Sequence, residues 1–314
     1  MSPNASDVKF ISLAEIGYTT SSLPDSPYEG VTTIWRMSLK DKKPVSVAKL
    51  QGGVADIEWS PDGSNVAILG SELWLKVGSA APRALTAPFV GGGRDGTSLD
   101  ELIVRYSHDG KYLVMVDTGV SGQAPKSAAQ AMLQVRSVPD GKLVWAAPGA
   151  LKGGWTTMAA WSHTSDRLFY DEALAVIQPF GVKTWDAPTK VVVTLAGGVI
   201  WYSPSVSPDD RLVAYHVESA TDAKPHLEVR DLVSGSVRVL AGIRGKPFLL
   251  SDEVMIEQHY LLISGFGPPY VPGQYFVLNL KTNVETSLSA TFNCPLMMDA
   301  SQCSEHGPLE IWPH

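Results

Sequence analysis

Carboxylates are the side chains of this sequence with the clearest potential for chemistry. Two carboxyl groups at a suitable separation can cleave a glycosidic bond, one as proton donor and the other as base or nucleophile. The candidates are Asp56 and Glu101, which come where the chain enters two predicted strands, and the later pair Asp171 and Glu172. The sequence leaves their separation open, so a hydrolase or lyase of the glycoside or ester class stands as one alternative.

Other catalytic patterns are absent from the sequence. It has no His-Glu-x-x-His, Cys-x-x-Cys, Walker or Gly-x-Ser-x-Gly pattern. Residues 91–96 have the glycine spacing of a dinucleotide-binding loop, but no strand-to-helix context surrounds them, so they are predicted to form a loop. The seven histidines are dispersed along the chain. We therefore expect neither a metal site nor a cofactor.

Aromatic and charged side chains near the predicted crossings between sheets form the candidate binding set. Aromatic rings offer stacking platforms for a sugar or a peptide, although tryptophan more often packs inside a protein. The loop 265–273 is rich in proline and glycine, and a stiff loop loses little entropy on binding. The complete candidate set is Asp56, Glu101, Trp155, Trp201, Tyr202, Arg244 and Tyr270.

The two cysteines bear on the compartment of the protein. Cys294 and Cys303 are nine positions apart near the end of the chain, and they form either a disulfide or two separate thiols. A disulfide there would favour a periplasmic or secreted protein over a cytoplasmic one. Residues 1–6 have neither the basic start nor the apolar core of a signal peptide. The alternatives are a cytoplasmic protein and the mature part of an exported one.

A repeated pattern predicts the elements that must position these residues. Four times an apolar strand runs into a polar turn and then into a second apolar strand. The residues before the turns, Trp59, Tyr106, Trp161 and Val206, are spaced by 47, 55 and 45 positions. The turns are Ser60-Pro61-Asp62-Gly63, Ser107-His108-Asp109-Gly110, Ser162-His163-Thr164-Ser165 and Ser207-Pro208-Asp209-Asp210. A period of this length with paired strands is typical of a propeller.

The turn residues have physical reasons to recur. Aspartate can bond back to the backbone, and glycine accepts a positive φ. Asp210 stands where two of the turns have glycine, and aspartate tolerates the left-handed region. A second, less regular hairpin follows each of these units, as in 133–145 and 227–240, which makes four strands a unit.

Two further units fill the same period without the turn, which brings the total to six. The sequence therefore predicts a single all-β domain over residues 1–314, a six-bladed β-propeller of four-stranded antiparallel blades. The predicted blades are 8–50, 54–86, 101–147, 156–195, 200–241 and 246–288, with an irregular tail over 290–314. Within the tail, 309–312 is a candidate closing strand. Glu58 and Arg105 hold equivalent positions in adjacent blades, each one residue before Trp59 or Tyr106, and we expect them to form a structural ion pair.

The segment Trp59-Ser60-Pro61-Asp62-Gly63, followed by Val66-Ala67-Ile68, resembles the TolB-like, WD-repeat-like β-propellers. The resemblance covers about four of the six blades. It implies the propeller architecture and no particular activity, because such propellers include binding modules, scaffolds and domains attached to peptidases. No segment for a separate hydrolase domain follows residue 290.

Composition narrows the possible partners. The chain is 44% hydrophobic and 18% charged with a net charge of −7, which disfavours nucleic acid as a partner. No stretch has the roughly 18 apolar residues of a membrane span. The leading hypothesis is a non-catalytic module that binds a protein, peptide or carbohydrate at the channel face formed by the loops that cross between blades. A third possibility is a propeller that belongs to a larger chain.

Overall fold

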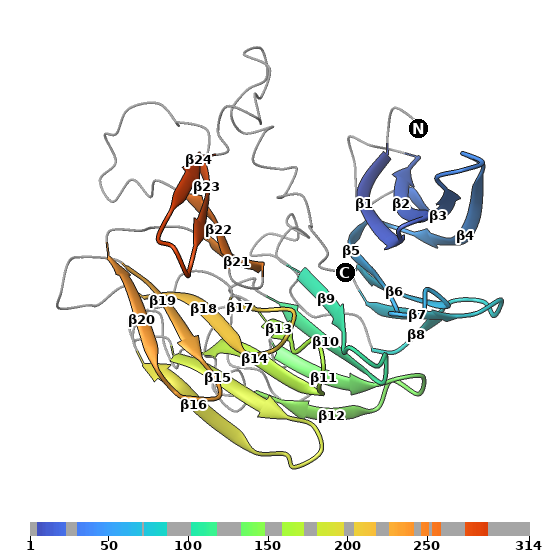
Figure 1. Ribbon diagram of the computed structural model, residues 1–314. Helices are drawn as coiled ribbons and strands as arrows, with labels where there is room; N and C mark the ends of the chain where they lie inside the picture. The colour runs from blue at the N-terminus through green and yellow to red at the C-terminus, as the bar shows by residue number, and fades with distance from the viewer. Residues whose placement is uncertain are drawn as a thin grey trace, which may run out of the picture. The chain divides into compact units, whose positions relative to one another are not determined.

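The structure is a computed structural model in which every described element is a β-strand (Figure 1). It describes residues 5–22, 30–70, 72–86, 102–117, 133–147, 159–172, 181–197, 204–217, 226–241, 246–250, 253–258 and 274–287. The strands form six four-stranded sheets, and in each sheet the strands lie side by side in chain order. Strands that follow one another in a sheet pair in the antiparallel sense, as the strands of hairpins do. The predicted all-β class with six four-stranded antiparallel units is confirmed.

The first three sheets cover the N-terminal part of the chain. Their strands are β1 (Ala5–Ser12), β2 (Glu15–Ser21), β3 (Val31–Ser38), β4 (Pro44–Gln51), β5 (Val54–Trp59), β6 (Asn65–Gly70), β7 (Leu73–Val77), β8 (Arg83–Ala84), β9 (Leu102–Tyr106), β10 (Tyr112–Asp117), β11 (Leu133–Ser137) and β12 (Leu143–Ala146). Since each sheet follows chain order, the first strand and the fourth strand lie at its two edges.

The other three sheets follow the same plan. Their strands are β13 (Ala159–Trp161), β14 (Arg167–Glu172), β15 (Gly181–Asp186), β16 (Val192–Gly197), β17 (Ser205–Val206), β18 (Leu212–Val217), β19 (His226–Asp231), β20 (Val237–Ala241), β21 (Lys246–Leu250), β22 (Glu253–Gln258), β23 (Gln274–Asn279) and β24 (Glu285–Ser287). The chain divides into two compact units. Unit 1 comprises Met1–Trp161 and Glu172–Ile177, and unit 2 comprises Ser162–Asp171 and Gln178–His314.

The core of unit 1 lies between successive sheets. Ile68 of β6 packs with Ile34 of the first sheet, whereas its neighbour Leu69 packs with Leu113 and Met115 of the third sheet. Successive residues of a strand point to opposite faces, so a sheet between two others is apolar on both faces. This explains why residues 66–70 of β6 are all buried. In unit 2, the fifth and sixth sheets pack in the same way through Leu227, Leu249 and other residues.

The predicted Ser-x-Asp turns form a repeated hydrogen-bond pattern. In the turn between β9 and β10, the Ser107 hydroxyl donates to Asp109 Oδ1 over 3.0 Å, and the Tyr112 amide donates back to Ser107 Oγ over 3.0 Å. The corresponding bonds recur in the turns that begin at Ser60 and Ser207. These three turns are confirmed as structural elements that hold the first two strands of a sheet together.

Gly17 of β2 lies directly against Trp59 of the second sheet. A Cβ atom at this position would lie 2.1 Å from Nε1 of Trp59, a ring that is only 7% exposed. Arg36 lies over the same indole ring, with its Cζ 5.9 Å from the centroid. Glycine is therefore required at position 17 so that Trp59 can fill the space between the sheets.

Gly17→Ala is expected to destabilise the protein by about 1–3 kcal/mol, because the added methyl group overpacks the space that the indole occupies. The free energy of unfolding from urea titration, followed by tryptophan fluorescence, measures the effect. In a Trp59→Leu background the further loss caused by Gly17→Ala should be smaller, since the smaller side chain removes the clash. Equal stability of G17A and the wild type would contradict the close approach.

Candidate functional site

Asp56 is the one member of the candidate binding set that lies among the described residues, and its side chain is buried. The other members, Glu101, Trp155, Trp201, Tyr202, Arg244 and Tyr270, lie outside the described residues, as do Cys294, Cys303 and the candidate strand 309–312. Of the other carboxylate pair, Asp171 is fully buried near the end of β14, and the side chain of Glu172 lies outside the described residues. Trp59 and Trp161, which precede two of the turns, are each 7% exposed and therefore pack inside the protein.

Asp56 is the centre of a buried group of charges in unit 1, here called the inner-edge cluster, which consists of Lys9, Asp56, Glu58 and Arg105. The Lys9 ammonium donates to Asp56 Oδ1 over 2.7 Å and to Glu58 Oε2 over 3.2 Å. Arg105 Nη1 donates to Asp56 Oδ2 over 2.5 Å and lies 3.9 Å from Glu58 Oε2. The Val104 amide also donates to Asp56 Oδ2, over 3.0 Å. The predicted Glu58–Arg105 ion pair is thus present, and Asp56 and Lys9 complete it.

The first strands of three successive sheets position the cluster. β1, β5 and β9 are the edge strands that begin the first, second and third sheets, and β5 contacts both of the others. Each strand carries its charged residue between an apolar and an aromatic one, in Val8-Lys9-Phe10, Ile57-Glu58-Trp59 and Val104-Arg105-Tyr106. Lys9 is not among the residues predicted from the sequence, and this repeated triplet is the signal that identifies it.

The electrostatics of the cluster keep Asp56 ionised. Burial by itself would raise the pKa of the Asp56 carboxyl, but the positive charges of Arg105 and Lys9 and the hydrogen bonds to Lys9 and Val104 outweigh it, and the pKa lies below its usual value. A carboxyl that stays ionised cannot donate a proton at neutral pH. Two acidic and two basic side chains balance one another in the cluster. The role that this arrangement supports is structural: the ion pairs join the edge strands of three sheets.

A second carboxylate, Asp210, joins neighbouring turns within unit 2. Asp210 Oδ2 accepts a hydrogen bond from the Ser162 hydroxyl over 2.6 Å and from the Thr164 amide over 2.7 Å. The His163 amide donates to Oδ1 over 2.7 Å, and the Thr164 hydroxyl donates to Oδ2. The turn at Ser162 has threonine where the other turns have aspartate, so Asp210 supplies the missing carboxylate. Its φ of 55° confirms the predicted left-handed conformation.

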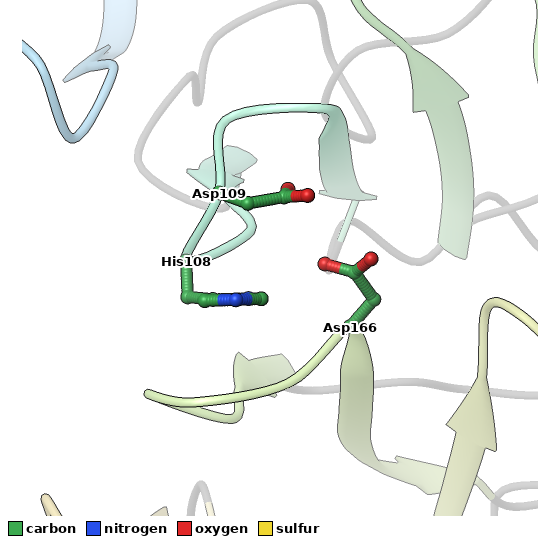
Figure 2. Close-up of side chains that lie close together, drawn as sticks. All are labelled: His108, Asp109 and Asp166. Atoms are coloured by element: carbon green, nitrogen blue, oxygen red, sulfur yellow. The ribbon is translucent and has the colours of Figure 1, made fainter.

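Figure 2 labels His108 and Asp109 on the turn between β9 and β10, and Asp166 next to the start of β14. His108 and His163, which both lie in turns, are exposed. The Asp109 carboxylate accepts hydrogen bonds from Ser107 and from the Lys111 amide. Because His108 and Asp109 belong to unit 1 and Asp166 belongs to unit 2, we assign no common site to them.

The aspartates of the turns are expected to titrate in strong acid. Hydrogen bonds from Ser60 and Ser64 lower the pKa of Asp62 to about 2. Burial would raise the pKa of Asp109, but bonds from Lys111 and Ser107 outweigh it and lower that pKa to about 2 as well. The pKa of each of these carboxyl groups is lower in the folded than in the unfolded protein. They therefore stabilise the fold fully at pH values above the ordinary pKa of a carboxyl group. Their contribution falls away as the pH drops toward the folded pKa.

Carboxyl carbon chemical shifts of Asp62 and Asp109, followed by NMR from neutral pH into acid, would measure this prediction. We expect the turn aspartates to titrate at lower pH than a carboxyl of ordinary pKa. Substituting Ser107 by alanine should move the Asp109 midpoint upward, since it removes one donor. Titration of Asp109 at an unshifted midpoint in the wild type would contradict the hydrogen bonding of the turn.

Comparison with solved structures adds three similar folds. The β-propeller domain of the Trilobed protease from Pyrococcus furiosus is 10% identical with a TM-score of 0.56, covering 91% of this chain and 84% of that one. An oligogalacturonate lyase in complex with manganese is also 10% identical with a TM-score of 0.56, covering 87% and 73%. TolB from Acinetobacter baumannii is 15% identical with a TM-score of 0.46 and covers 76% of this chain. No family model and no curated protein matches the chain.

The six four-stranded antiparallel sheets and the propeller of the Trilobed protease establish the class: the chain is an all-β, six-bladed β-propeller. The propeller architecture that the resemblance around Trp59 implied is thus confirmed. The chain spans 54% of the length of the TolB from Acinetobacter baumannii. In the described part of the chain, no helix is present that could cross a membrane. Because these solved structures are at most 15% identical to the chain, their similarity to it concerns the fold alone.

Proposed function

We propose that the protein is a non-catalytic binding module whose ligand is a protein, a peptide or a carbohydrate. The binding surface is the channel face formed by the loops that cross between blades, with Trp201, Tyr202 and Tyr270 as the aromatic contacts. The observation that supports binding over hydrolysis is the state of Asp56. Both of its carboxylate oxygens are occupied by Lys9, Arg105 and the Val104 amide.

The inner-edge cluster suits a scaffold for such loops. It holds β1, β5 and β9 together at their edges with side chains that are mostly removed from water: the exposed fractions are 10% for Lys9, 12% for Asp56 and 7% for Glu58. Arg105 is the most exposed member, at 31%. A rigid frame lowers the entropy cost of presenting binding loops.

The alternative is a hydrolase or lyase that uses carboxylates at the channel mouth. One of the similar structures is an oligogalacturonate lyase, so oligogalacturonate is a suitable test substrate alongside aryl glycosides and esters. Formation of an unsaturated sugar would report a lyase by ultraviolet absorbance. We expect no turnover that depends on Asp56, because the residue is buried and both of its carboxylate oxygens already accept hydrogen bonds from Lys9, Arg105 and the Val104 amide.

Binding is tested with the whole chain against an array of neutral and acidic oligosaccharides and a displayed peptide library. Variants Trp201→Ala, Tyr202→Ala and Tyr270→Ala should each weaken the strongest interaction about tenfold, a loss typical of one aromatic contact. Asp41→Ala, an exposed change in the loop between β3 and β4, is the matched control and should bind as the wild type does. Turnover abolished by Asp56→Asn, without any such binding, would refute the proposal in favour of the enzyme.

A further inference from the structure

Arg136 of β11 is a buried cation whose hydrogen-bond acceptors among the described residues are all uncharged. The residue is 7% exposed. Nη1 donates to the Gly141 carbonyl over 2.9 Å, and Nη2 donates to Gln134 Oε1 over 2.9 Å. In the part of the chain that the structure describes, no carboxylate forms an ion pair with it. Within that part, the Arg136 guanidinium is therefore a buried charge without a countercharge.

One donor of this guanidinium has no acceptor among the described residues. That donor is Nε of Arg136, which is buried. An arginine cannot relieve the cost by losing its proton, because the guanidinium stays charged in proteins. Removing an unpaired charge from water costs several kcal/mol, and buried donors are nearly always satisfied. Both observations call for an acceptor of negative charge at Nε.

The position of Arg136 in the third sheet places this donor between the second and third sheets. Across the sheet, Arg136 lies opposite Leu113, which lies opposite Tyr106, so the three side chains share one face. That face packs against the second sheet through Leu113 and Tyr106. The Tyr106 hydroxyl is also buried without a hydrogen-bond partner among the described residues. Within this part of the chain, the same interior face thus carries two donors that lack acceptors.

The surroundings limit the size of an acceptor. Leu85 packs against the third sheet at the turn that contains Gly141, where an added Cβ would lie 2.6 Å from Leu85 Cδ2. The Gly141 carbonyl is also the acceptor for Arg136 Nη1. In this setting a small ion from solution needs less room than a carboxylate carried by another macromolecule.

We infer that Arg136 anchors a buried site for a small monovalent anion, of the size of chloride or formate, between the second and third blades. Gln134 and the Gly141 carbonyl orient the guanidinium so that its Nε–H donates to the anion. This inference is independent of the proposed binding function, which concerns loops at the channel face.

Thermal unfolding in chloride and in gluconate at equal ionic strength tests the site. Gluconate is too large to enter, so only chloride stabilises the folded state by binding it. We expect the melting temperature of the wild type to exceed that of Arg136→Met by about 2 °C more in chloride than in gluconate. Equal differences between wild type and Arg136→Met in the two salts would overturn the inference.

Lys76→Met is the matched control. Lys76 is a buried cation of the second sheet at 8% exposure, and its ammonium donates to the carbonyls of Gly78 and Ala80. Because two carbonyls accept from its Nζ, whereas Arg136 Nε has no acceptor among the described residues, Lys76→Met should leave the chloride effect unchanged. A chloride effect that disappears equally in Lys76→Met would also count against a site at Arg136.

A direct measurement covers the case in which Arg136→Met does not fold. Crystals of the wild type soaked in bromide should show an anomalous peak within hydrogen-bond distance of Arg136 Nε. A water molecule at that place, with no anomalous signal, would overturn the anion site and assign the unsatisfied donor to solvent.

Discussion

Replacing Asp56 by alanine is expected to lower the free energy of unfolding by about 3–5 kcal/mol, the usual cost of removing one partner from a buried ion pair. The substitution leaves Lys9 and Arg105 with Glu58 as their only carboxylate in the cluster, and it removes the acceptor of the Val104 amide. Asp56→Asn keeps the shape of the side chain, so its free energy of unfolding should fall less than that of Asp56→Ala. Urea unfolding at neutral pH measures the free energy of unfolding of the wild type, Asp56→Ala and Asp56→Asn.

A double-mutant cycle separates the ion pair from general damage to the core. Arg105→Ala combined with Asp56→Ala should cost clearly less than the sum of the two single changes, since the residues are in contact. Asp41→Ala, an exposed aspartate in unit 1, should change stability by no more than about 0.5 kcal/mol. Additive losses in the cycle would show that Asp56 and Arg105 are not coupled.

The second large effect is expected at Asp210, where alanine should lower the free energy of unfolding by about 2–3 kcal/mol. The Asp210 carboxylate accepts bonds from Ser162, His163 and Thr164, and Ser162 is buried. Alanine also has to adopt the left-handed conformation at φ 55°. Glycine adopts it freely, so Asp210→Gly should be about 1 kcal/mol more stable than Asp210→Ala.

A compensating change tests the role assigned to Asp210. Thr164 stands where the other turns have Asp62, Asp109 and Asp209. The double variant Thr164→Asp with Asp210→Gly gives the turn at Ser162 its own carboxylate and should regain much of the stability lost in Asp210→Gly. Thr164→Asp alone places a second carboxylate beside Asp210 and should destabilise. No recovery in the double variant would mean that the bonds to Asp210 do not hold this turn.

The sequence predicts the fold of this protein better than its site. The Ser-x-Asp turns are local, because the hydroxyl of Ser107 and the carboxylate of Asp109 bond within the same few residues. Such patterns can be recognised in a single chain, and they led to four-stranded units. The Glu58–Arg105 pair was also predictable, because equivalent positions of a repeat lie side by side in adjacent blades.

The missing parts depend on contacts between distant residues. The first blade lacks the Ser-x-Asp turn. The pairing of β1 with β2 also contains register shifts on both sides of the stretch Lys9–Phe10. A shift of one residue changes the face to which a side chain points. The spacing of the repeat alone therefore does not predict the approach of Lys9 to Asp56, and the triplet around Lys9 is the signal that remains. Asp210 was predicted for its backbone conformation alone, since its partners are 46 to 48 residues away.

The inner-edge cluster restricts how such a repeat protein can be rearranged by recombination. The second blade contributes two carboxylates, Asp56 and Glu58, and the blades on its two sides contribute one cation each, Lys9 and Arg105. A duplicated second blade would place carboxylates against carboxylates, and a transplanted one would bury two negative charges without a counterion. Shuffled or lengthened propellers built from this chain should therefore keep the first three blades as one cassette.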